Sequence, residues 1–314
     1  MNQIILRSFA KLNLFLKIQN KRIDGFHNIV TIFERINLFD EIQFKATNTG
    51  KIQIQCNHPH VPLGSSNLIH KVAIILQKKY QVKQGVKVVI NKRIPVAAGL
   101  AGGSSNAATA IEGLTKIWKI KLNLREKQVL AGQIGSDVAF FLMQHPWGVG
   151  VQRGELVSKL PIKAKLWHIL VVPKVKMRTP KVYQGLKLKP QEFGAEFYIS
   201  KGRIEIAKCQ KNRVLTNLLT KTVDNANILI HNLKRENTLE ITRYLTNDLQ
   251  PVVEGFCPRI KFLKQRLKSL NIQGVMLSGS GPSVYGITSS REEAINAAAI
   301  LSKKYSQVFV VRTL

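Results

Sequence analysis

Residues 95–108 read Pro-Val-Ala-Ala-Gly-Leu-Ala-Gly-Gly-Ser-Ser-Asn-Ala-Ala, and this run of small residues decides the expected fold around it. The preceding segment 86–90, Val-Lys-Val-Val-Ile, is short and β-branched, which predicts a strand. From 106 to 118 apolar residues recur at helical spacing, which predicts a helix. Backbone N–H groups at a helix start have no intrahelical partner, and small residues let an anion approach them. We therefore expect a phosphate-binding loop, to which Ser104 and Ser105 add hydroxyls. The simpler alternative is a glycine-rich turn with a serine cap.

Two common phosphate-binding motifs are excluded by the order of the residues in this stretch. No lysine follows the glycines, so it is not the Gly-x-x-x-x-Gly-Lys-Ser/Thr loop. Its glycines are also not spaced as Gly-x-Gly-x-x-Gly. If the loop binds a phosphate, it belongs to another class of phosphate-binding site.

The composition of the chain indicates a globular protein of one large domain or two medium domains. It has 314 residues, 45% of them hydrophobic, and no apolar run long enough to predict a membrane span. Arg7 and Lys11 interrupt the N-terminal segment, which does not resemble a secretory signal. The three cysteines, Cys56, Cys209 and Cys257, are far apart, which argues against a zinc site or a disulfide framework. We expect a cytoplasmic protein with no membrane partner.

The net charge of +30 predicts attraction to anions. A nucleic acid and an anionic substrate are both consistent with it, and so is a surface that simply carries many solvated lysines. The basic residues are spread along the whole chain, with few aromatic residues among them, which disfavours a stacking surface for single strands.

The order of predicted elements favours an α+β fold with mixed or antiparallel sheets. A doubly wound parallel sheet would need strands and helices to alternate regularly, and they do not. A Lys- and Pro-rich break over 173–191 predicts a boundary between domains 1–165 and 166–314. The predicted strands lie at 3–18 (two strands meeting at 10–11), 29–33, 41–44, 51–54, 86–90, 148–157, 168–172, 274–278, 283–287 and 308–312. The predicted helices lie at 67–80 (capped by Ser65 or Ser66), 106–118, 124–134, 224–235, 239–245, 258–270 and 292–304.

Four further segments carry residues suited to chemistry, and each also has a purely structural interpretation. Lys11 and Asn13 share one face of an apolar strand, where a buried lysine needs an anion; the alternative is an edge-strand lysine. Residues 24–28, Asp-Gly-Phe-His-Asn, form either a binding turn or an ordinary hairpin turn. Asp137 lies among small and apolar residues and is either a functional carboxylate or a helix cap. Residues 277–283, Leu-Ser-Gly-Ser-Gly-Pro-Ser, form either a second close-approach loop or a tight turn.

Taken in order, these segments resemble the GHMP kinase superfamily. The resemblance covers residues 10 to 286 and is poorest at 187–246, where no motif can be placed. The Gly-Leu-x-Gly-Gly-Ser-Ser loop indicates the superfamily. The Lys-Leu-Asn-Leu-Phe-Leu and Asp-Gly-Phe-His segments resemble its members that act on a cytidine diphosphate-linked methylerythritol in the non-mevalonate isoprenoid pathway.

The resemblance implies a two-domain kinase with its active site in the cleft between the domains. The N-terminal domain would be ribosomal protein S5 domain 2-like and the C-terminal domain ferredoxin-like. The implied reaction transfers the γ-phosphoryl group of ATP, with Mg²⁺, to the substrate 2-hydroxyl. Asp137 would be the base, with Lys11 beside it keeping the carboxylate ionised. The magnesium ligands and the oligomeric state are not indicated.

The resemblance also implies binding residues. For ATP, Asn67 would lie near the adenine, and the phosphates would be surrounded by Pro95, Ala98, Gly99, Leu100, Ala101, Gly102, Gly103, Ser104 and Ser105. For the substrate, His27 would hydrogen-bond the cytosine, and Phe26 and Tyr183 would stack on it. The rest of the substrate would be held by Asn13, Lys92 and Thr179.

The chain departs from the superfamily pattern at four positions. Ala97 and Ala101 stand where glycine is usual, and because alanine is strained at positive φ, we predict negative φ at both. Phe26 replaces a common tyrosine, which keeps the ring and loses a hydroxyl. Ser136 replaces the alanine that usually precedes the aspartate. None of these changes removes a catalytic group.

Two rival functions remain at this point. A sister kinase, such as homoserine kinase or a kinase of the mevalonate pathway, would share the glycine loop but bind no cytidine, so the Phe26-His27 segment disfavours it. A nucleic-acid-binding protein would suit the charge, but it gives no reason for Lys11 and Asp137 near a phosphate loop. We therefore expect a small-molecule substrate and no nucleic-acid partner.

Overall fold

The computed structural model describes residues 2–186, 188, 196–208 and 213–314. Contacts between residues divide the chain into two compact units. Unit 1 comprises Met1–Ala10, Leu38–Val96 and Ala101–Gln144, and unit 2 comprises Lys11–Asn37, Ala97–Leu100 and His145–Leu314. Strands β1 (Gln3–Lys21) and β2 (His27–Thr47) contribute residues to both units. Since the units do not follow chain order, the boundary near residue 165 stays a prediction.

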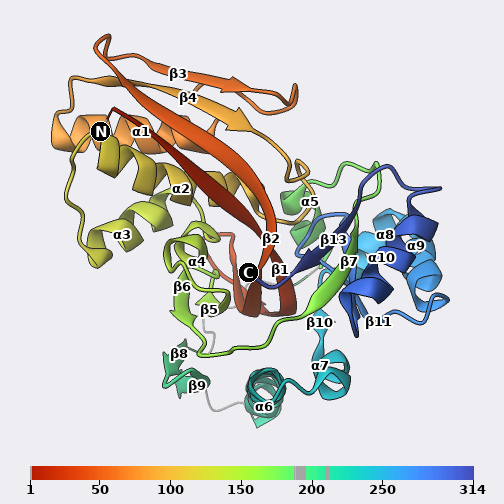
Figure 1. The fold of residues 1–314 in the computed structure, drawn as a ribbon. Helices are drawn as coiled ribbons and strands as arrows, with labels where there is room; N and C mark the ends of the chain where they lie inside the picture. Colours follow the sequence, from red (N-terminus) through yellow and green to blue (C-terminus); the bar gives the residue numbers. More distant parts are fainter. Residues whose placement is uncertain (1, 187, 189–195, 209–212) are drawn as a thin grey trace. The chain divides into compact units, whose positions relative to one another are not determined.

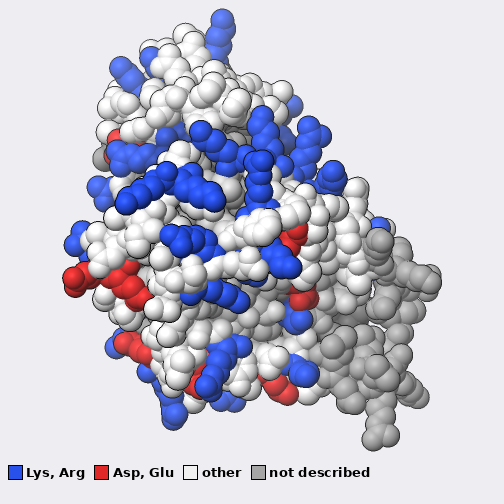
Figure 2. Space-filling view, turned by 90° about the vertical axis from the view of Figure 1, so that its right-hand side faces the viewer, with Lys and Arg blue, Asp and Glu red and all other residues white. Residues whose placement is uncertain are grey.

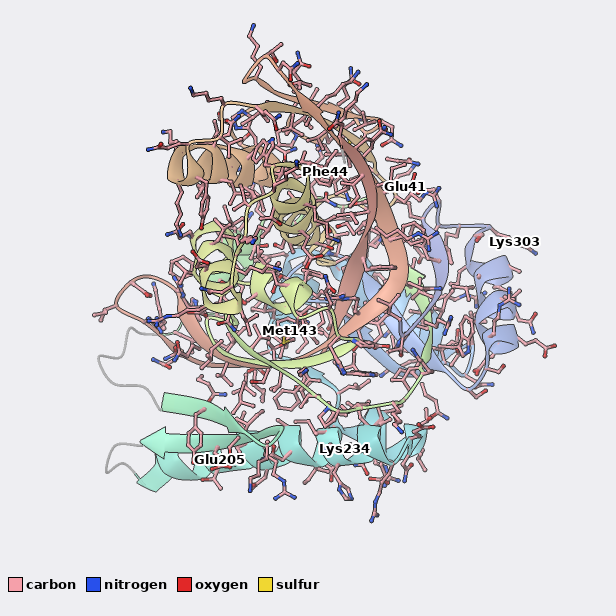
Figure 3. The ribbon with its side chains drawn as sticks, turned by 60° about the vertical axis from the view of Figure 1, so that its left-hand side comes forward. Glu41, Phe44, Met143, Glu205, Lys234 and Lys303 are labelled. Carbon is pink, nitrogen blue, oxygen red and sulfur yellow. The ribbon has the colours of Figure 1, made fainter. Side chains whose placement is uncertain are left out.

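Unit 1 is a sheet with helices on one face. The end of β2 pairs antiparallel with β4 (Gly85–Asn91), and β4 pairs parallel with β3 (Ile52–Cys56). The helices are α1 (Leu68–Tyr80), α2 (Gly102–Ile117), α3 (Leu124–Ile134) and α4 (Val138–Leu142). Helices α1 and α2 lie along the same face of β3 and β4 (Figure 1). A Cβ at Gly113 would lie 2.6 Å from the ring of Phe44, so α2 needs glycine there to pack on β2 (Figure 3).

Unit 2 contains a first sheet around the inner parts of β1 and β2. Residues 29–34 of β2 pair antiparallel with β5 (Trp147–Gln152), which pairs with β6 (Leu156–Lys159). Phe15 and Leu16 of β1 pair parallel with β10 (Thr246–Asn247). Strand β1 therefore lies between β10 and β2. Because Lys11 is only 4% exposed on this strand, the edge-strand interpretation of that lysine is wrong.

The second sheet of unit 2 has the strand order β11-β12-β7-β13, and every pairing in it is antiparallel. Its strands are β7 (Trp167–Val171), β11 (Gln273–Leu277), β12 (Val284–Thr288) and β13 (Val308–Arg312). Helices α8 (Gln250–Phe256), α9 (Pro258–Lys268) and α10 (Arg291–Leu301) share an apolar core with it (Figure 1). With α9 and α10 as its two helices, this sheet is ferredoxin-like, as predicted.

The remaining elements of unit 2 lie between β7 and β10 in the sequence. They are α5 (Thr179–Gln184), β8 (Glu196–Ser200), β9 (Arg203–Lys208), α6 (Arg213–Lys234) and α7 (Thr238–Tyr244). The β8–β9 hairpin, which carries Glu205, lies along α6, which ends at Lys234 (Figure 3). The Asn227 side chain exchanges two hydrogen bonds of 3.1 Å with the backbone of Ile204. Among the described residues, no helix has both the length and the apolar character needed to cross a bilayer.

Several predicted elements are confirmed. Helix α3 has the predicted bounds, and the closing strand-turn-strand-helix-strand order is present. The α+β class is also confirmed. These segments have clear periodicity and strong end signals. In α3, Asn123 and Glu126 form a capping box, in which each side chain accepts from the other residue's backbone N–H.

Other predictions were wrong. The strands expected at 3–18 and at 29–44 are two long, continuous strands, because both faces of their central parts are buried and no turn is needed. Asn67, not Ser65 or Ser66, caps α1. Helix α2 begins at Gly102 rather than at 106. The sequence did not reveal this start, because the first turn consists of glycines and serines, which lack the apolar spacing of a helix. Helices α4, α5 and α8 and strands β8, β9 and β10 were not predicted. The strand expected at 148–157 is the antiparallel pair β5 and β6, and the helix expected at 224–235 is the longer α6. Cys209 and the end of the predicted 173–191 break lie outside the described residues.

Candidate active site

Three residues of the expected phosphate-binding loop have left-handed backbone. The φ angles are +55° at Ala97, +82° at Gly99 and +54° at Ala101. The prediction of negative φ at the two alanines was therefore wrong. Left-handed backbone costs an alanine about 1–2 kcal/mol. The cost is borne because the surrounding fold holds the loop: Ala98 and Leu100 between them are buried, and Ala101 must turn the chain into α2.

The second small-residue loop packs its backbone directly against the first. A Cβ at Gly281 would lie 2.1 Å from the nitrogen of Gly99, and one at Gly99 would lie 2.2 Å from the oxygen of Ser278. Ser283 N–H donates to the oxygen of Ala98 at 3.3 Å, and the Ser278 hydroxyl donates to the oxygen of Gly99 at 3.1 Å. Glycine is required at both positions for this contact. The segment 278–283 thus supports the phosphate loop, which the sequence did not reveal.

The start of α2 lies among buried polar groups of unit 1. The Ser105 hydroxyl accepts from the Ser8 hydroxyl at 2.7 Å, and the Asn106 amide donates to both Ser8 and Asp40. Helix α2 has no acidic residue in its first turn, so its dipole leaves the N-terminus electropositive. Leu68, at the start of α1, lies 3.8 Å from the position of a Cβ on Gly103. Helix α1 therefore begins beside the glycines, as the adenine prediction for Asn67 requires.

Asn67 itself is committed to capping α1. Its side-chain oxygen accepts from the N–H of Ile69 at 2.8 Å, and its amide donates to the oxygen of Pro62 at 2.6 Å. The side chain is 7% exposed. Any contribution to adenine binding therefore comes from a rigid, already ordered amide.

The Lys92 side chain lies beside Gly102, at the end of the small-residue loop. Its ammonium is 2.7 Å from Asp40 Oδ2, donates to the oxygen of Ile94, and is 3.0 Å from the position of a Cβ on Gly102. Burial lowers the pKa of Lys92, and the Asp40 carboxylate opposes that shift. Within unit 1 this ammonium is therefore a buried partner of Asp40 beside the α2 N-terminus. Its predicted role toward the substrate stays a prediction.

Lys11 belongs to a buried polar group on β1 and β2. Its ammonium donates to Asn13 Oδ1 and lies 5.6 Å from the centre of the Phe33 ring. The position of a Cβ on Gly279 is 3.5 Å from this ammonium and 3.2 Å from the oxygen of Gly99. Lys11 N–H also donates to the oxygen of Leu100 at 3.2 Å. Unit 2 thus brings the lysine to the two small-residue loops.

The predicted base-recognition residues lie together in unit 2. The rings of His27 and Tyr183 are 5.1 Å apart. Phe26 is 53% exposed, and the Arg153 guanidinium lies 5.0 Å from its ring centre. Burial, and then the positive charge of Lys21, lower the pKa of His27 below its ordinary value. A neutral imidazole and an exposed aromatic face are suited to a pyrimidine.

Two further predicted residues have defined places. The Thr179 hydroxyl, at the start of α5, is 2.7 Å from the Ser280 hydroxyl, so α5 meets the second loop within unit 2. Asp137 precedes α4 in unit 1 with helical φ and ψ and makes no side-chain capping hydrogen bond to that helix. Asp137 therefore occupies the N-cap position of α4 without capping that helix through its side chain.

The donor set suits a nucleotide better than a protein-held metal. Among the described residues, no group of three or more His, Cys, Asp or Glu side chains could hold a metal ion. The exposed glycine at 103, the electropositive helix start and the Lys92 ammonium suit phosphate oxygens. Magnesium in such sites is held largely by phosphates and water.

Four contributors were missed in the sequence: Asp40, Thr31, Tyr285 and Arg153. Thr31 is a polar residue within the apolar segment 29–33, and that contrast was the available signal for it, whereas Asp40 is followed by Glu41 and shows no such contrast. Tyr285 donates from its hydroxyl to the oxygen of Asn13 at 3.0 Å, a contact 272 residues apart in sequence. The residues next to Tyr285 in the sequence gave no indication of this contact.

Comparison with known proteins places this arrangement in a family. The sequence pattern of the GHMP kinase N-terminal domain matches residues 67–145, and that of the GHMP kinase C-terminal domain matches 229–307. A crystal structure of 4-(cytidine 5'-diphospho)-2C-methyl-D-erythritol kinase superposes with a TM-score of 0.75, covering 99% of this chain and all of that one, at 24% identity. The mevalonate kinase of L. major gives a TM-score of 0.70 at 13% identity and 99% and 97% coverage. The two family patterns together match half of the chain, which shows that it is a GHMP kinase, and the solved structures share its fold.

Full-length relatives show which family of GHMP kinases the chain belongs to. The 4-diphosphocytidyl-2-C-methyl-D-erythritol kinase of Clostridioides difficile (strain 630) is 33% identical over 100% of this chain and 96% of its own length. The enzyme of the same name from Trichodesmium erythraeum (strain IMS101) is 34% identical, with 94% and 90% coverage. The chain belongs to the 4-diphosphocytidyl-2-C-methyl-D-erythritol kinase family.

Proposed function

We propose that this protein transfers the γ-phosphoryl group of ATP to the 2-hydroxyl of 4-diphosphocytidyl-2-C-methyl-D-erythritol. Full-length membership of the kinase family carries the proposal. The site supports it, because unit 1 offers an electropositive helix start with Lys92, and unit 2 offers an aromatic and imidazole group suited to a pyrimidine.

The proposed roles follow from the chemistry of each group. Asp137 accepts the proton of the attacking hydroxyl, and Lys11 stabilises negative charge on the transferred group. The α2 N-terminus holds the phosphates of ATP, and Mg²⁺ bound with ATP would neutralise charge on them. His27, Phe26 and Tyr183 bind the cytosine, while Asn13, Lys92 and Thr179 hold the remainder of that substrate.

The test is turnover of purified protein with ATP, Mg²⁺ and the cytidine substrate, followed by ADP release. We expect turnover in the wild type and a loss of about 10²-fold or more in Asp137→Asn, since a positioned base contributes about 10²–10⁴-fold. Asp224→Asn makes the same chemical change at an exposed position on α6 and should retain full activity. A folded wild type that releases no ADP with this substrate, but does so with homoserine or mevalonate, would reject the proposed substrate.

A further inference from the structure

Asn13 connects two polar side chains in the buried interior of unit 2. Its side-chain oxygen accepts from the Lys11 ammonium, and its amide nitrogen donates to Thr31 Oγ1 at 2.8 Å. Lys11, Asn13 and Thr31 are 4%, 3% and 0% exposed. Water therefore does not replace these partners readily, and each hydrogen bond depends on the next residue in the chain of contacts.

The orientation of the Asn13 amide matters because its two ends are chemically opposite. An ammonium carries only donors, so it needs the amide oxygen and is repelled by the amide NH₂. The NH₂ end then faces Thr31, whose hydroxyl supplies the acceptor. If that acceptor is removed, a buried donor is left without a partner, which is costly enough for the side chain to turn away.

A different residue, Tyr285, contacts the backbone of Asn13, whereas Thr31 contacts its side chain. Tyr285 donates to the backbone oxygen of Asn13 at 3.0 Å, which anchors β1 to β12. Phe33 lies two residues beyond Thr31, on the same face of β2, and places its ring 5.6 Å from the Lys11 ammonium. Two described side-chain hydrogen bonds therefore fix the rotation of the Asn13 amide: the one it accepts from Lys11 and the one it donates to Thr31.

We infer that Thr31 is a positioning residue that holds the Lys11 ammonium in place through Asn13. The inference rests on the proposed function, in which Lys11 stabilises charge during phosphoryl transfer. Thr31 contacts neither substrate in this account. Its loss therefore weakens one of the contacts that position Lys11, without removing any group that binds ATP or cytidine.

The test compares Thr31→Val with Thr31→Ser. Valine matches the shape of threonine but removes the hydroxyl, whereas serine keeps the hydroxyl and removes a methyl group. We expect kcat to fall about tenfold in Thr31→Val, which corresponds to one displaced hydrogen-bonding interaction, with KM for both substrates within about twofold. Thr31→Ser should retain kcat close to the wild-type value.

A matched control separates positioning from loss of stability. Thr288 is also a buried threonine, and its hydroxyl donates to the oxygen of Ser290 at 3.0 Å. Thr288→Val makes the same substitution away from Lys11 and should leave kcat unchanged. Equal loss of kcat in both valine variants, or equal loss in Thr31→Val and Thr31→Ser, would overturn the inference.

Crystal structures of the two Thr31 variants give a readout that does not depend on the substrate. The contact between Lys11 and Asn13 Oδ1 should be lost in Thr31→Val and kept in Thr31→Ser. If the contact survives in Thr31→Val, the inference is wrong whatever the activity. If the wild type fails to turn over the cytidine substrate, the proposed function fails, and the crystal comparison still decides whether Thr31 positions Lys11.

Discussion

Ala97 and Ala101 occupy backbone conformations that favour glycine, at φ values of +55° and +54°. We predict that Ala97→Gly and Ala101→Gly each raise the free energy of unfolding by roughly 0.5–1 kcal/mol. The relief of left-handed strain, about 1–2 kcal/mol, exceeds the added entropy of the unfolded chain, about 0.4–1 kcal/mol. Urea unfolding measures the change. Ala98→Gly is the control, because Ala98 has no positive φ and should lose stability. Destabilisation by all three would contradict the argument.

His27 makes the proposed cytosine site sensitive to acid. Because burial and Lys21 lower its pKa, the imidazole is neutral at pH 7 and protonates only below the ordinary histidine value of about 6.5. We expect KM for the cytidine substrate to be constant from pH 8 to about 6.5 and to rise below it, while KM for ATP does not follow. The unfolded chain binds this proton more readily, so stability also falls as the pH drops below about 6.5. A rise in KM that begins well above pH 6.5 would argue against His27.

Asp40 joins strand β2 to the strand–loop–helix segment that forms the phosphate loop. Its carboxylate accepts from Lys92, Asn106 and the N–H groups of Arg93 and Ile94, all at 2.7–2.8 Å. All of these groups belong to unit 1, and Asp40 is fully buried. The arrangement fixes the end of β4 relative to the start of α2, which is what a preformed anion site requires.

We predict that Asp40→Asn lowers the free energy of unfolding by about 3–5 kcal/mol, because it leaves the Lys92 ammonium buried without its counterion. Urea unfolding followed by circular dichroism measures the loss. Glu240→Gln is the comparison, since it breaks the exposed pair with Arg243 and should cost about 0.5 kcal/mol or less. Adding Lys92→Met to Asp40→Asn should recover part of the loss. A small effect of Asp40→Asn would show that the pair is not stabilising.

The charge of +30 acts at the scale of the whole molecule. Lys and Arg side chains are spread over the described part of the visible face, with few Asp and Glu among them (Figure 2). Both proposed substrates are anionic. A positive field raises their encounter rate, and added salt screens that field.

We therefore predict that kcat/KM for the cytidine substrate falls by about tenfold or more between 20 mM and about 500 mM KCl, while kcat changes little. Steady-state kinetics at several salt concentrations measures this fall, with NaCl as a control for ion identity. An unchanged kcat/KM would show that the charge does not steer the substrate. Binding of RNA that is steeply weakened by salt would instead support the nucleic-acid alternative.

Much of the molecule was predictable from local sequence. The α+β class, helix α3, the closing strand-turn-strand-helix-strand order and the small-residue loop before α2 all followed from periodicity and from residues that end helices and strands. These signals are local, because side-chain spacing and capping act within a few residues. The order of the motifs also indicated the family that the full-length relatives show.

Only the tertiary structure decided how the segments support one another. Positive φ at Ala97 and Ala101, the backbone contact of Gly99 with Gly281, and the four bonds to Asp40 depend on residues far apart in sequence. The hydrogen bonds from Lys11 through Asn13 to Thr31 depend on β1 and β2 lying side by side. Such contacts leave no periodic trace, because one polar residue in an apolar strand looks the same whether its partner is water, a neighbouring strand or a ligand. The sequence by itself determined which residues are chemically capable, and the fold determined which of them meet.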